Sequence, residues 1–412
     1  MSYKILVVYG YRDYPVRSTS WNHLYSHGMY SGHECYYLNL AVNRVPWYLK
    51  RIKFDLIIFD TLFFVRFKRR YFEGLMRRAA VLKQSGAVKI MLPQDEFINT
   101  DLLNRFACEF GVDHIFSVAP PSEWDKIYDG VDRSRTCLHK VLTGYLDQAS
   151  VETINATRDI SRDIDIGYCA ADPPFWHGRH GMLKGRIGEA FLNSPAAHGL
   201  RMNIITPKGH PFLGDEWLRF LLRCKYTLGV EGGTSILDRD GTISACTERY
   251  RQEHPQAGFE EVEQHCFPGL DGSFRLFALS PRHLEACATR TCQILIEGDY
   301  DGVLQPWKHY LPLKKDFSNL EEIVALVKND SLRTEITQRA YHDIVASGAY
   351  GYPLYSARIL EEALGIDTAP QDGQVTPMPL QRLAALGDRL SWHKVRLICI
   401  AKRLLKPLLG VR

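Results

Sequence analysis

Short apolar runs alternate with amphipathic stretches through the first 155 residues of the chain. Continuous apolar strands that are separated by helices are typical of a parallel sheet covered on both faces. Residues 1–155 are therefore predicted to form a Rossmann-like domain, with one basic helix at 71–84. The predicted strands of this domain cover residues 4–8, 54–60, 88–92, 114–118 and 137–142.

The same alternation resumes after residue 155 and continues to about residue 365, which predicts a second Rossmann-like domain at 156–365. A chain of 412 residues is too long for one ordinary core and fits two domains. The predicted fold class is thus α/β, with two Rossmann-like domains facing each other across a cleft. The second domain's predicted strands are 164–169, 202–206, 226–230 and 291–296, and its helices are 183–191, 215–223, 281–288, 319–328 and 332–346.

The last part of the chain has a different composition. Residues 366–379 are rich in Pro, Gly, Gln and Thr and are predicted to be a linker. Residues 380–412 carry eight Arg or Lys against one acid, Asp388, with Trp392 and several leucines at helical spacing. A basic amphipathic helix of this kind is typical of binding at an anionic membrane surface. The alternative is a helix docked on the protein itself, with its arginines in water.

Composition and charge exclude several function classes. The net charge of +4 is too small for a dedicated nucleic-acid binder. The apolar run at 5–8 is too short for a secretory signal, and no run is long enough to span a bilayer, so a cytoplasmic protein is expected. The ten cysteines stand singly, with no C-x-x-C pair, and are interpreted as core thiols rather than zinc ligands or disulfides.

The most specific pattern lies at residues 274–323, where an Arg-containing turn leads into a helix bearing Glu-Ala and then into a strand. This block resembles the donor-site region of GT-B glycosyltransferases, in particular the bacterial family 1-like and family 4-like enzymes that build cell-surface polysaccharides. The resemblance implies that Glu285 binds the ribose hydroxyls of a nucleotide, with Ser280 and Arg282 beside it. A carboxylate suits this role because it accepts two hydrogen bonds from a diol.

Two features limit the resemblance. Phe277 stands where the family 4 pattern has a glutamate. Glu285 also has a simpler interpretation, as an acid near a helix N-terminus that complements the helix dipole.

Two further segments are candidates for donor binding. Residues 172–186 follow the first strand of the second domain, where related enzymes place cations on the donor diphosphate. Arg179, Lys184 and Arg186 are the candidates for this role, although a solvated basic loop is the alternative. Gly232 and Gly233 follow the strand at 226–230 and either border the donor pocket or form a tight turn.

The first domain offers candidates for the acceptor side. Residues 10–28 are interpreted as a long polar and aromatic loop, and loops of this type are commonly functional. Asp95 and Glu96 end a predicted strand, and either is a candidate general base, with a helix N-terminal acid pair as the alternative. The loop's candidates are Arg12, Asp13 and His27 for acceptor binding and His23 for base work.

These observations favour a transferase that moves a sugar from a nucleotide-sugar to a glycan or lipid-linked acceptor in surface polysaccharide synthesis. The resemblance implies no metal and no cofactor beyond the donor, and the sequence has no Walker loop and no G-x-G-x-x-G fingerprint. The expected partners are the nucleotide-sugar, the acceptor and, through residues 380–412, an anionic membrane surface, with no nucleic acid. A nucleotide-sugar epimerase and a non-catalytic scaffold of the same fold are the alternatives.

Overall fold

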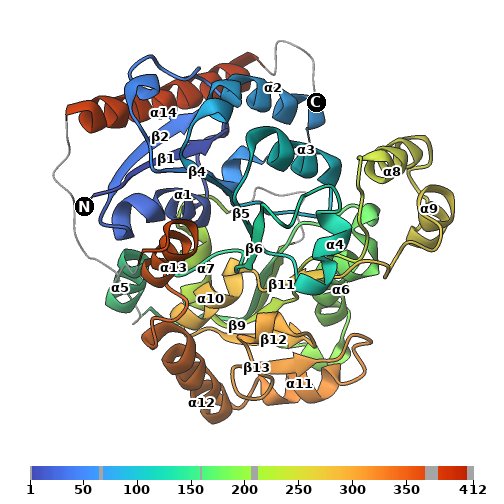
Figure 1. Ribbon diagram of the computed structural model, residues 1–412. Helices are drawn as coiled ribbons and strands as arrows, with labels where there is room; N and C mark the ends of the chain where they lie inside the picture. The colour runs from blue at the N-terminus through green and yellow to red at the C-terminus, as the bar shows by residue number, and fades with distance from the viewer. Residues whose placement is uncertain (1, 65–67, 158–159, 206–211, 367–378, 406–412) are drawn as a thin grey trace. The chain divides into compact units, whose positions relative to one another are not determined.

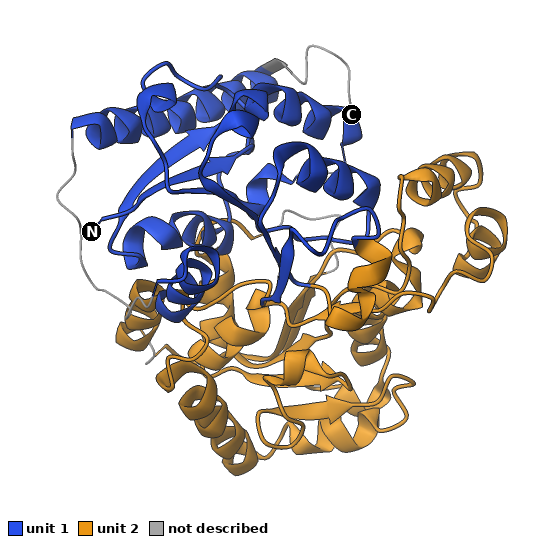
Figure 2. Ribbon diagram, in the orientation of Figure 1, with its two compact units in different colours: residues 1–118, 128–141, 353–412 blue, residues 119–127, 142–352 orange. Residues whose placement is uncertain are grey.

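The computed structural model describes residues 2–64, 68–157, 160–205, 212–366 and 379–405 (Figure 1). The chain divides into two compact units (Figure 2). Unit 1 consists of residues 1–118, 128–141 and 353–412, and unit 2 of residues 119–127 and 142–352.

This division differs from the predicted domain boundaries at residues 155 and 365. The chain returns to the first unit after residue 352, because the last two helices bury side chains there. The predicted linker at 366–379 lies almost entirely outside the described residues.

Unit 1 is built on a parallel six-stranded sheet with the strand order β2-β1-β3-β4-β5-β6. The five strands predicted for this region are confirmed, and β2 was missed. Residues 18–30 form a helix, so the interpretation of 10–28 as one loop was wrong. The strands are β1 (Lys4–Tyr9), β2 (Glu34–Asn39), β3 (Leu56–Phe59), β4 (Val88–Met91), β5 (His114–Ser117) and β6 (Cys137–Lys140). The helices are α1 (Ser18–Tyr30), α2 (Arg69–Ala79), α3 (Thr100–Phe110), α13 (Tyr352–Leu364, from its second residue on) and α14 (Pro379–Leu405).

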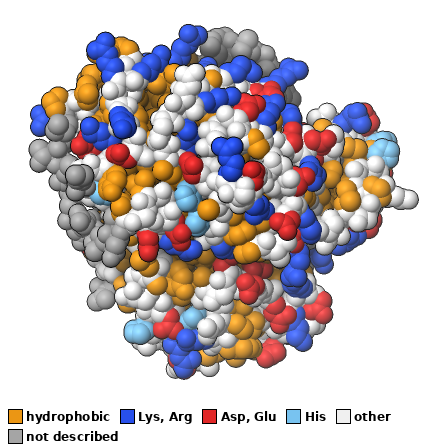
Figure 3. All heavy atoms as spheres, viewed as in Figure 1, with side chains coloured by type: hydrophobic (Ala, Val, Ile, Leu, Met, Phe, Trp, Pro, Cys, Tyr) orange, Lys and Arg blue, Asp and Glu red, His pale blue; other side chains and the backbone are white. Residues whose placement is uncertain are grey.

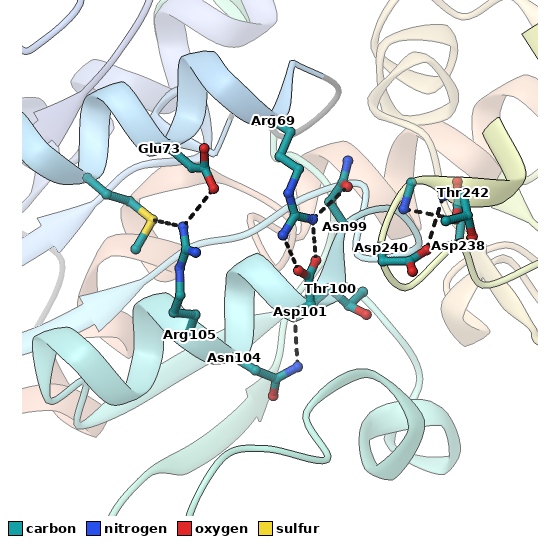
Figure 4. A network of polar contacts seen from close by, with 12 residues as sticks. Arg69, Glu73, Asn99, Thr100, Asp101, Asn104, Arg105, Asp238, Asp240 and Thr242 are labelled. Carbon is teal, nitrogen blue, oxygen red and sulfur yellow. Dashed lines mark hydrogen bonds and ion pairs between the residues drawn. The ribbon is translucent and has the colours of Figure 1, made fainter. Parts of the chain in front are cut away.

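Helices α2 and α3 are joined by polar contacts on the surface of unit 1. Arg69 makes a two-pronged contact with the Asp101 carboxylate, at 2.5 and 3.0 Å, and Arg105 donates to Glu73 at 3.1 Å (Figure 4). Exposed ion pairs of this kind stabilise a fold only slightly. The attachment of the two helices therefore comes mainly from buried aromatic rings between them and the sheet, including Phe72.

Unit 2 contains a parallel five-stranded sheet with the order β13-β12-β9-β7-β8 and a separate antiparallel pair, β10-β11. The four strands predicted here are confirmed. The strands are β7 (Ile164–Cys169), β8 (Met202–Ile205), β9 (Cys224–Gly229), β10 (Gly232–Thr234), β11 (Leu276–Ala278), β12 (Cys292–Ile296) and β13 (Tyr310–Leu313). The helices are α4 (Trp124–Ile127), α5 (Gln148–Ala156), α6 (Gly178–Leu192), α7 (Glu216–Arg223), α8 (Thr242–Glu253), α9 (Phe259–Cys266), α10 (Pro281–Ala288), α11 (Leu320–Leu326) and α12 (Asp330–Ala340).

Helices α8 and α9 form a hairpin inserted between β10 and β11. A disulfide joins Cys246 of α8 to Cys266 of α9. The interpretation of every cysteine as an isolated thiol was wrong for this pair. The two residues lie 20 positions apart in no recognisable motif, and only the folding back of the hairpin brings them together.

Helix α14 packs along β2 of its own unit (Figure 1). Asp388 is buried and accepts hydrogen bonds from the hydroxyls of Tyr9 at 2.5 Å and Tyr25 at 2.6 Å. The indole N–H of Trp392 donates to the Tyr25 hydroxyl at 2.7 Å, and the Trp392 ring packs 5.2 Å from that of Trp21. Residues 379–405 are therefore docked on the protein itself, as the alternative interpretation had it, because this helix carries the buried acid and the indole that attach it.

Residues 406–412 of the predicted tail lie outside the described part of the chain. Among the helices that the structure describes, none combines the length and the apolar character required to cross a bilayer.

Candidate functional site

Three of the predicted donor-binding segments converge at the carboxyl edge of the sheet of unit 2. Helix α6 is the next α-helix after β7, and the guanidinium of Arg282 in α10 donates to the carbonyl oxygen of Cys169, the last residue of β7. The ring of His283 lies 3.3 Å from the carbonyl oxygen of Val230, just after β9. Ligands of open α/β sheets bind at this edge, so the segment positions agree with a donor site within unit 2.

Glu285 is the most unusual side chain of this region. It is buried, and its Oε2 atom has no hydrogen-bond partner among the described residues. Burial raises the pKa of its carboxyl group to about 7, against the opposing effects of the Arg282 charge and the nearby indole of Trp217. A buried carboxyl oxygen that lacks a hydrogen-bond partner destabilises the folded state. Such a group is expected where a ligand supplies the missing partner.

The N-terminal end of α10 has no side-chain cap. Ser280 precedes the helix without capping it through its side chain. Its neighbour Arg282 lies over the Trp217 ring at 4.7 Å. Uncapped N–H groups beside a fixed cation form a suitable environment for an anion.

The Lys184 ammonium lies close enough to His177, His180 and, in α10, His283 for its charge to act on all three rings. Burial and then the Lys184 charge lower the pKa of His180 to about 3 and that of His177 to about 4. Both imidazoles are therefore neutral near pH 7. The His180 ring stacks on Phe277 with centroids 3.6 Å apart, so an aromatic pair fills the position where the family 4 pattern has a carboxylate.

The other two predicted diphosphate cations are placed elsewhere. Arg179 pairs with Glu263 at 2.7 Å and with Asp271 at 2.8 Å, so it attaches α6 to the α8–α9 insertion and is not positioned as a phosphate ligand. These bonds raise its pKa well above the ordinary value. Arg186 lies two residues after Lys184, about 200° around the helix, and lines a separate cavity of about 430 Å³ between α6 and α8.

The two glycines of β10 have different roles. Gly233 has a φ of +108°, and a Cβ there would lie 1.8 Å from the carbonyl oxygen of Leu276 in β11. Its close backbone approach is thus to the neighbouring strand, a role that neither the donor-pocket nor the tight-turn interpretation described. A Cβ on Gly232 would meet only the Ala278 carbonyl oxygen, at 3.6 Å, which leaves this residue as a candidate for ligand contact.

The loop after β12 lies within the predicted donor block 274–323, but none of its residues was a predicted site residue. Tyr300 and Asp301 both have positive φ values, 49° and 54°, which non-glycine residues rarely adopt. The loop is fixed by the buried carboxylate of Glu231, which accepts the backbone N–H groups of Asp299 at 3.1 Å and Tyr300 at 2.8 Å. Strain held by such contacts is common at ligand sites. The loop is therefore added to the candidate site.

In unit 1, the predicted base His23 is part of a buried pair. Its Nδ1 atom lies 3.2 Å from Oδ2 of Asp60, which is fully buried at the end of β3. Its Nε2 atom lies 3.4 Å from the hydroxyl of Tyr355 in α13. A carboxylate on one imidazole nitrogen orients the ring and selects its tautomer. Asp60 was not identified from the sequence, because it lies 37 residues from its partner.

Glu96 does not have the freedom that a general base requires. Its carboxylate is fully buried and accepts hydrogen bonds from the Ser117 hydroxyl at 2.6 Å, the Val118 N–H at 2.7 Å and the Tyr128 hydroxyl. Its predicted catalytic role is corrected to a structural one. Asp95 is exposed and has a φ of 51°, so it stays a candidate for the base.

The predicted acceptor residues separate into two groups. His27 is fully buried, and neither ring nitrogen has a hydrogen-bond partner within the described ranges. Burial and the adjacent His23 charge lower its pKa to about 3, so it is a neutral core residue and not an acceptor ligand. Arg12 lies over the Tyr71 ring at 4.1 Å, and Asp13 beside it is exposed. These two remain available to an acceptor.

Comparisons with known proteins add the following findings. No protein-family model matches the chain. One segment is similar in sequence to Protein O-glucosyltransferase 1 of Mus musculus, at 35% identity over 102 residues, and to that of Homo sapiens, at 33% over 98 residues. These matches span 22% and 21% of this chain and 24% and 23% of the two relatives, so the chain matches about a quarter of their length.

The structure is similar to an alpha-glucosyltransferase in complex with UDP-glucose and DNA containing an abasic site. The TM-score is 0.52 at 9% identity, over 88% of this chain and 99% of that one. Anabaena HepE in complex with UDP-glucose has a TM-score of 0.49 at 8% identity, over 88% of this chain and 100% of that one. The first likeness confirms the predicted GT-B fold class, and at this identity it establishes the fold alone.

Proposed function

We propose that this protein is a glycosyltransferase that moves a sugar from a nucleotide-sugar to a glycan or lipid-linked acceptor. The observation that carries the proposal is the buried carboxyl of Glu285, at the carboxyl edge of the unit 2 sheet and beside Arg282. The Oε2 atom of this carboxyl has no hydrogen-bond partner among the described residues. Ribose hydroxyls would supply its missing hydrogen bonds. The alpha-glucosyltransferase that shares the fold is in complex with UDP-glucose, which makes a UDP-sugar the first donor to test.

The cations of the proposed donor site act on the leaving group of the transfer. As the bond between the anomeric carbon and the diphosphate oxygen breaks, negative charge develops on the leaving nucleoside diphosphate. Lys184 and Arg282 would stabilise that charge, since both lie at the edge where the donor is proposed to bind. With these cations in place we propose that no metal or further cofactor is needed. Transfer that survives EDTA supports this, and loss that Mg²⁺ restores contradicts it.

On the acceptor side we propose that His23 removes the proton from the attacking hydroxyl. Asp60 is then a positioning residue, because it holds the imidazole by its other nitrogen. Asp95 is the second candidate for the base.

The last part of the proposal concerns the cellular location of the reaction. We propose synthesis of a surface polysaccharide in the cytoplasm, with peripheral binding at the inner face of the plasma membrane through the basic helix α14. A reducing cytosol would hold Cys246 and Cys266 as thiols. Alkylation of intact cells followed by mass spectrometry tests the location, and an oxidised pair in cells argues against it.

The proposed donor site is tested by thermal shift with UDP, GDP, CMP and their common sugars. A ligand that binds only the folded protein raises the melting temperature according to its affinity. A shift with one nucleotide that is lost in Glu285→Ala, and lost equally with the 2′,3′-dideoxy nucleotide, supports diol binding. Glu335→Ala, at an exposed position on α12, is the matched control. No shift with any nucleotide refutes the proposal.

One observation favours a second candidate, a non-catalytic scaffold. Phe277 replaces the carboxylate of the family 4 pattern, and its stacking on His180 closes the space that a carboxylate would occupy. A scaffold would bind nucleotide without turning it over. Donor consumption measured with a panel of acceptors separates the two candidates.

A further inference from the structure

The outward face of α14 carries a stripe of leucines that the attachment of this helix to unit 1 does not use. The stripe belongs to a repeat in which Arg396 and Arg403 also contact Tyr14 of unit 1. Four Arg-Leu pairs recur every seven residues along it: Arg382-Leu383, Arg389-Leu390, Arg396-Leu397 and Arg403-Leu404. Seven residues are close to two helical turns, so the leucines form one stripe along a helix of 27 residues, about 40 Å long. These leucines are 41%, 51%, 66% and 69% exposed, from the first to the last.

The side chains that attach α14 to unit 1 lie on the opposite face. Val395 and Trp392 are buried, as is Asp388, which accepts two tyrosine hydroxyls. A helix with one packed face and one exposed apolar stripe has surface left for a partner.

Charge indicates what this partner is. The helix carries six Arg or Lys, and its single acid, Asp388, is buried, so the exposed face is cationic throughout the described residues 379–404. Unit 1 as a whole has 28 Arg and Lys against 17 Asp and Glu, whereas unit 2 has 23 against 30. Figure 3 shows Lys and Arg side chains lying together with hydrophobic ones over α14, at the top of the view.

Exposed aromatic side chains flank the same helix. Tyr14, 40% exposed, lies under the Arg396 guanidinium at 5.7 Å, and its carbonyl oxygen accepts a hydrogen bond from Arg403. Trp47, 64% exposed, precedes Tyr48, whose hydroxyl lies close to the Cα of Gly387. Tyrosine and tryptophan are enriched at the boundary between lipid headgroups and acyl chains.

We propose that the outward face of α14 binds an anionic lipid bilayer while the inward face stays docked on unit 1. In this arrangement the leucines of the repeat lie among acyl chains, and its arginines bind headgroup phosphates. A second copy of this chain is a poorer occupant, because pairing the stripes would bring cations against cations with no exposed acid on either helix. Docked binding also differs from a tail that detaches, since it makes unit 1 itself the membrane-facing body.

The docked arrangement places the candidate acceptor loop beside the helix that is proposed to bind the bilayer. The Cys399 thiol lies 3.4 Å from the carbonyl oxygen of Arg12, and Arg403 contacts the backbone of Tyr14. Arg12 and Asp13 therefore lie beside the last turns of the bound helix. On the premise of the proposed function, the acceptor is a lipid-linked molecule presented at this surface rather than a free sugar.

The first experiment is co-sedimentation of the full chain with vesicles of phosphatidylcholine alone or mixed with phosphatidylglycerol, without donor or acceptor. The wild-type protein should bind only the anionic vesicles. Each cation near such a surface contributes about fivefold in affinity, so Arg389→Glu with Arg396→Glu should lose at least about 25-fold. Leu390→Glu with Leu397→Glu should lose at least about tenfold.

The controls make the same changes elsewhere on unit 1. Leu354→Glu and Arg358→Glu, both at exposed positions on α13, should bind as the wild type does. Absence of wild-type binding to anionic vesicles, or unchanged binding by both double variants, overturns the proposal. A lipid-free dimer that Leu390→Glu dissociates would assign the stripe to a second copy instead. Since nucleotide is absent, failure here is distinct from failure of the proposed transferase activity.

Hydrogen exchange then separates docked binding from detachment. Strand β2, residues 34–39, is covered by α14. Its amide protection should be the same on vesicles as in solution, whereas faster exchange on vesicles would show that α14 leaves unit 1 and would overturn the docked arrangement.

Discussion

The conservative substitution Glu285→Gln should change stability in a way that depends on pH. Burial raises the folded-state pKa of this carboxyl from 4.5 to about 7. A carboxyl group whose pKa is higher in the folded than in the unfolded state favours folding at pH values below its unfolded-state pKa. This contribution is lost as the pH rises through the folded-state pKa. Above pH 7 the wild type therefore carries a cost of about 3 kcal/mol, which the uncharged glutamine avoids.

The expected shift is large enough to measure by calorimetry of the full chain at pH 5, 6, 7 and 8. For a unit of this size, 1 kcal/mol corresponds to about 2–4 °C. The variant should thus melt about 6–12 °C above the wild type at pH 8 and close to it at pH 5. Glu335→Gln, at an exposed position, should show no such trend. A difference between Glu285→Gln and wild type that stays constant from pH 5 to pH 8 would refute the reasoning.

The same ionisation links stability to ligand binding. Ribose hydroxyls donate to the carboxylate, so the ionised form of Glu285 should bind nucleotide more tightly. Nucleotide affinity of the wild type should rise as pH approaches 7 and level off above it, and the glutamine variant should lack this rise. The dissociation constant measured by calorimetry across this range provides the check.

Two further predictions concern the glycines of β10 and the buried pair of unit 1. Gly233→Ala should destabilise unit 2 by about 2–4 kcal/mol, because of its positive φ and the carbonyl of Leu276. Gly232→Ala should fold normally in the same denaturation experiment, and equal losses in the two variants would contradict the distinction. Asp60→Asn keeps the shape of the side chain but not its charge, so kcat should fall by about 10² or more with the melting temperature little changed. An unaltered kcat and pH profile would exclude His23 as the base that Asp60 positions.

Local patterns determined most of the secondary structure. β7 and α10 have the predicted bounds. A short apolar run predicts the strand, and an amphipathic segment that begins with proline predicts the helix, so each can be recognised from a few neighbouring residues. α1 was predicted to be a loop, because it consists largely of Ser, His, Gly and Tyr and its apolar positions show no clear helical spacing. β2 was missed because it begins and ends with polar residues, Glu34 and Asn39, although five of its six residues are buried.

The sequence by itself also determined the two-part α/β architecture and the candidate donor block around Glu285, because both depend on short-range order along the chain. Only the tertiary structure decided what each polar group does. Arg179 finds its acids 84 and 92 residues away, His23 finds Asp60 37 residues away, and α14 buries Asp388 against tyrosines more than 360 residues earlier. A charged side chain takes its role from the partner that folding brings to it, and no local pattern records that partner.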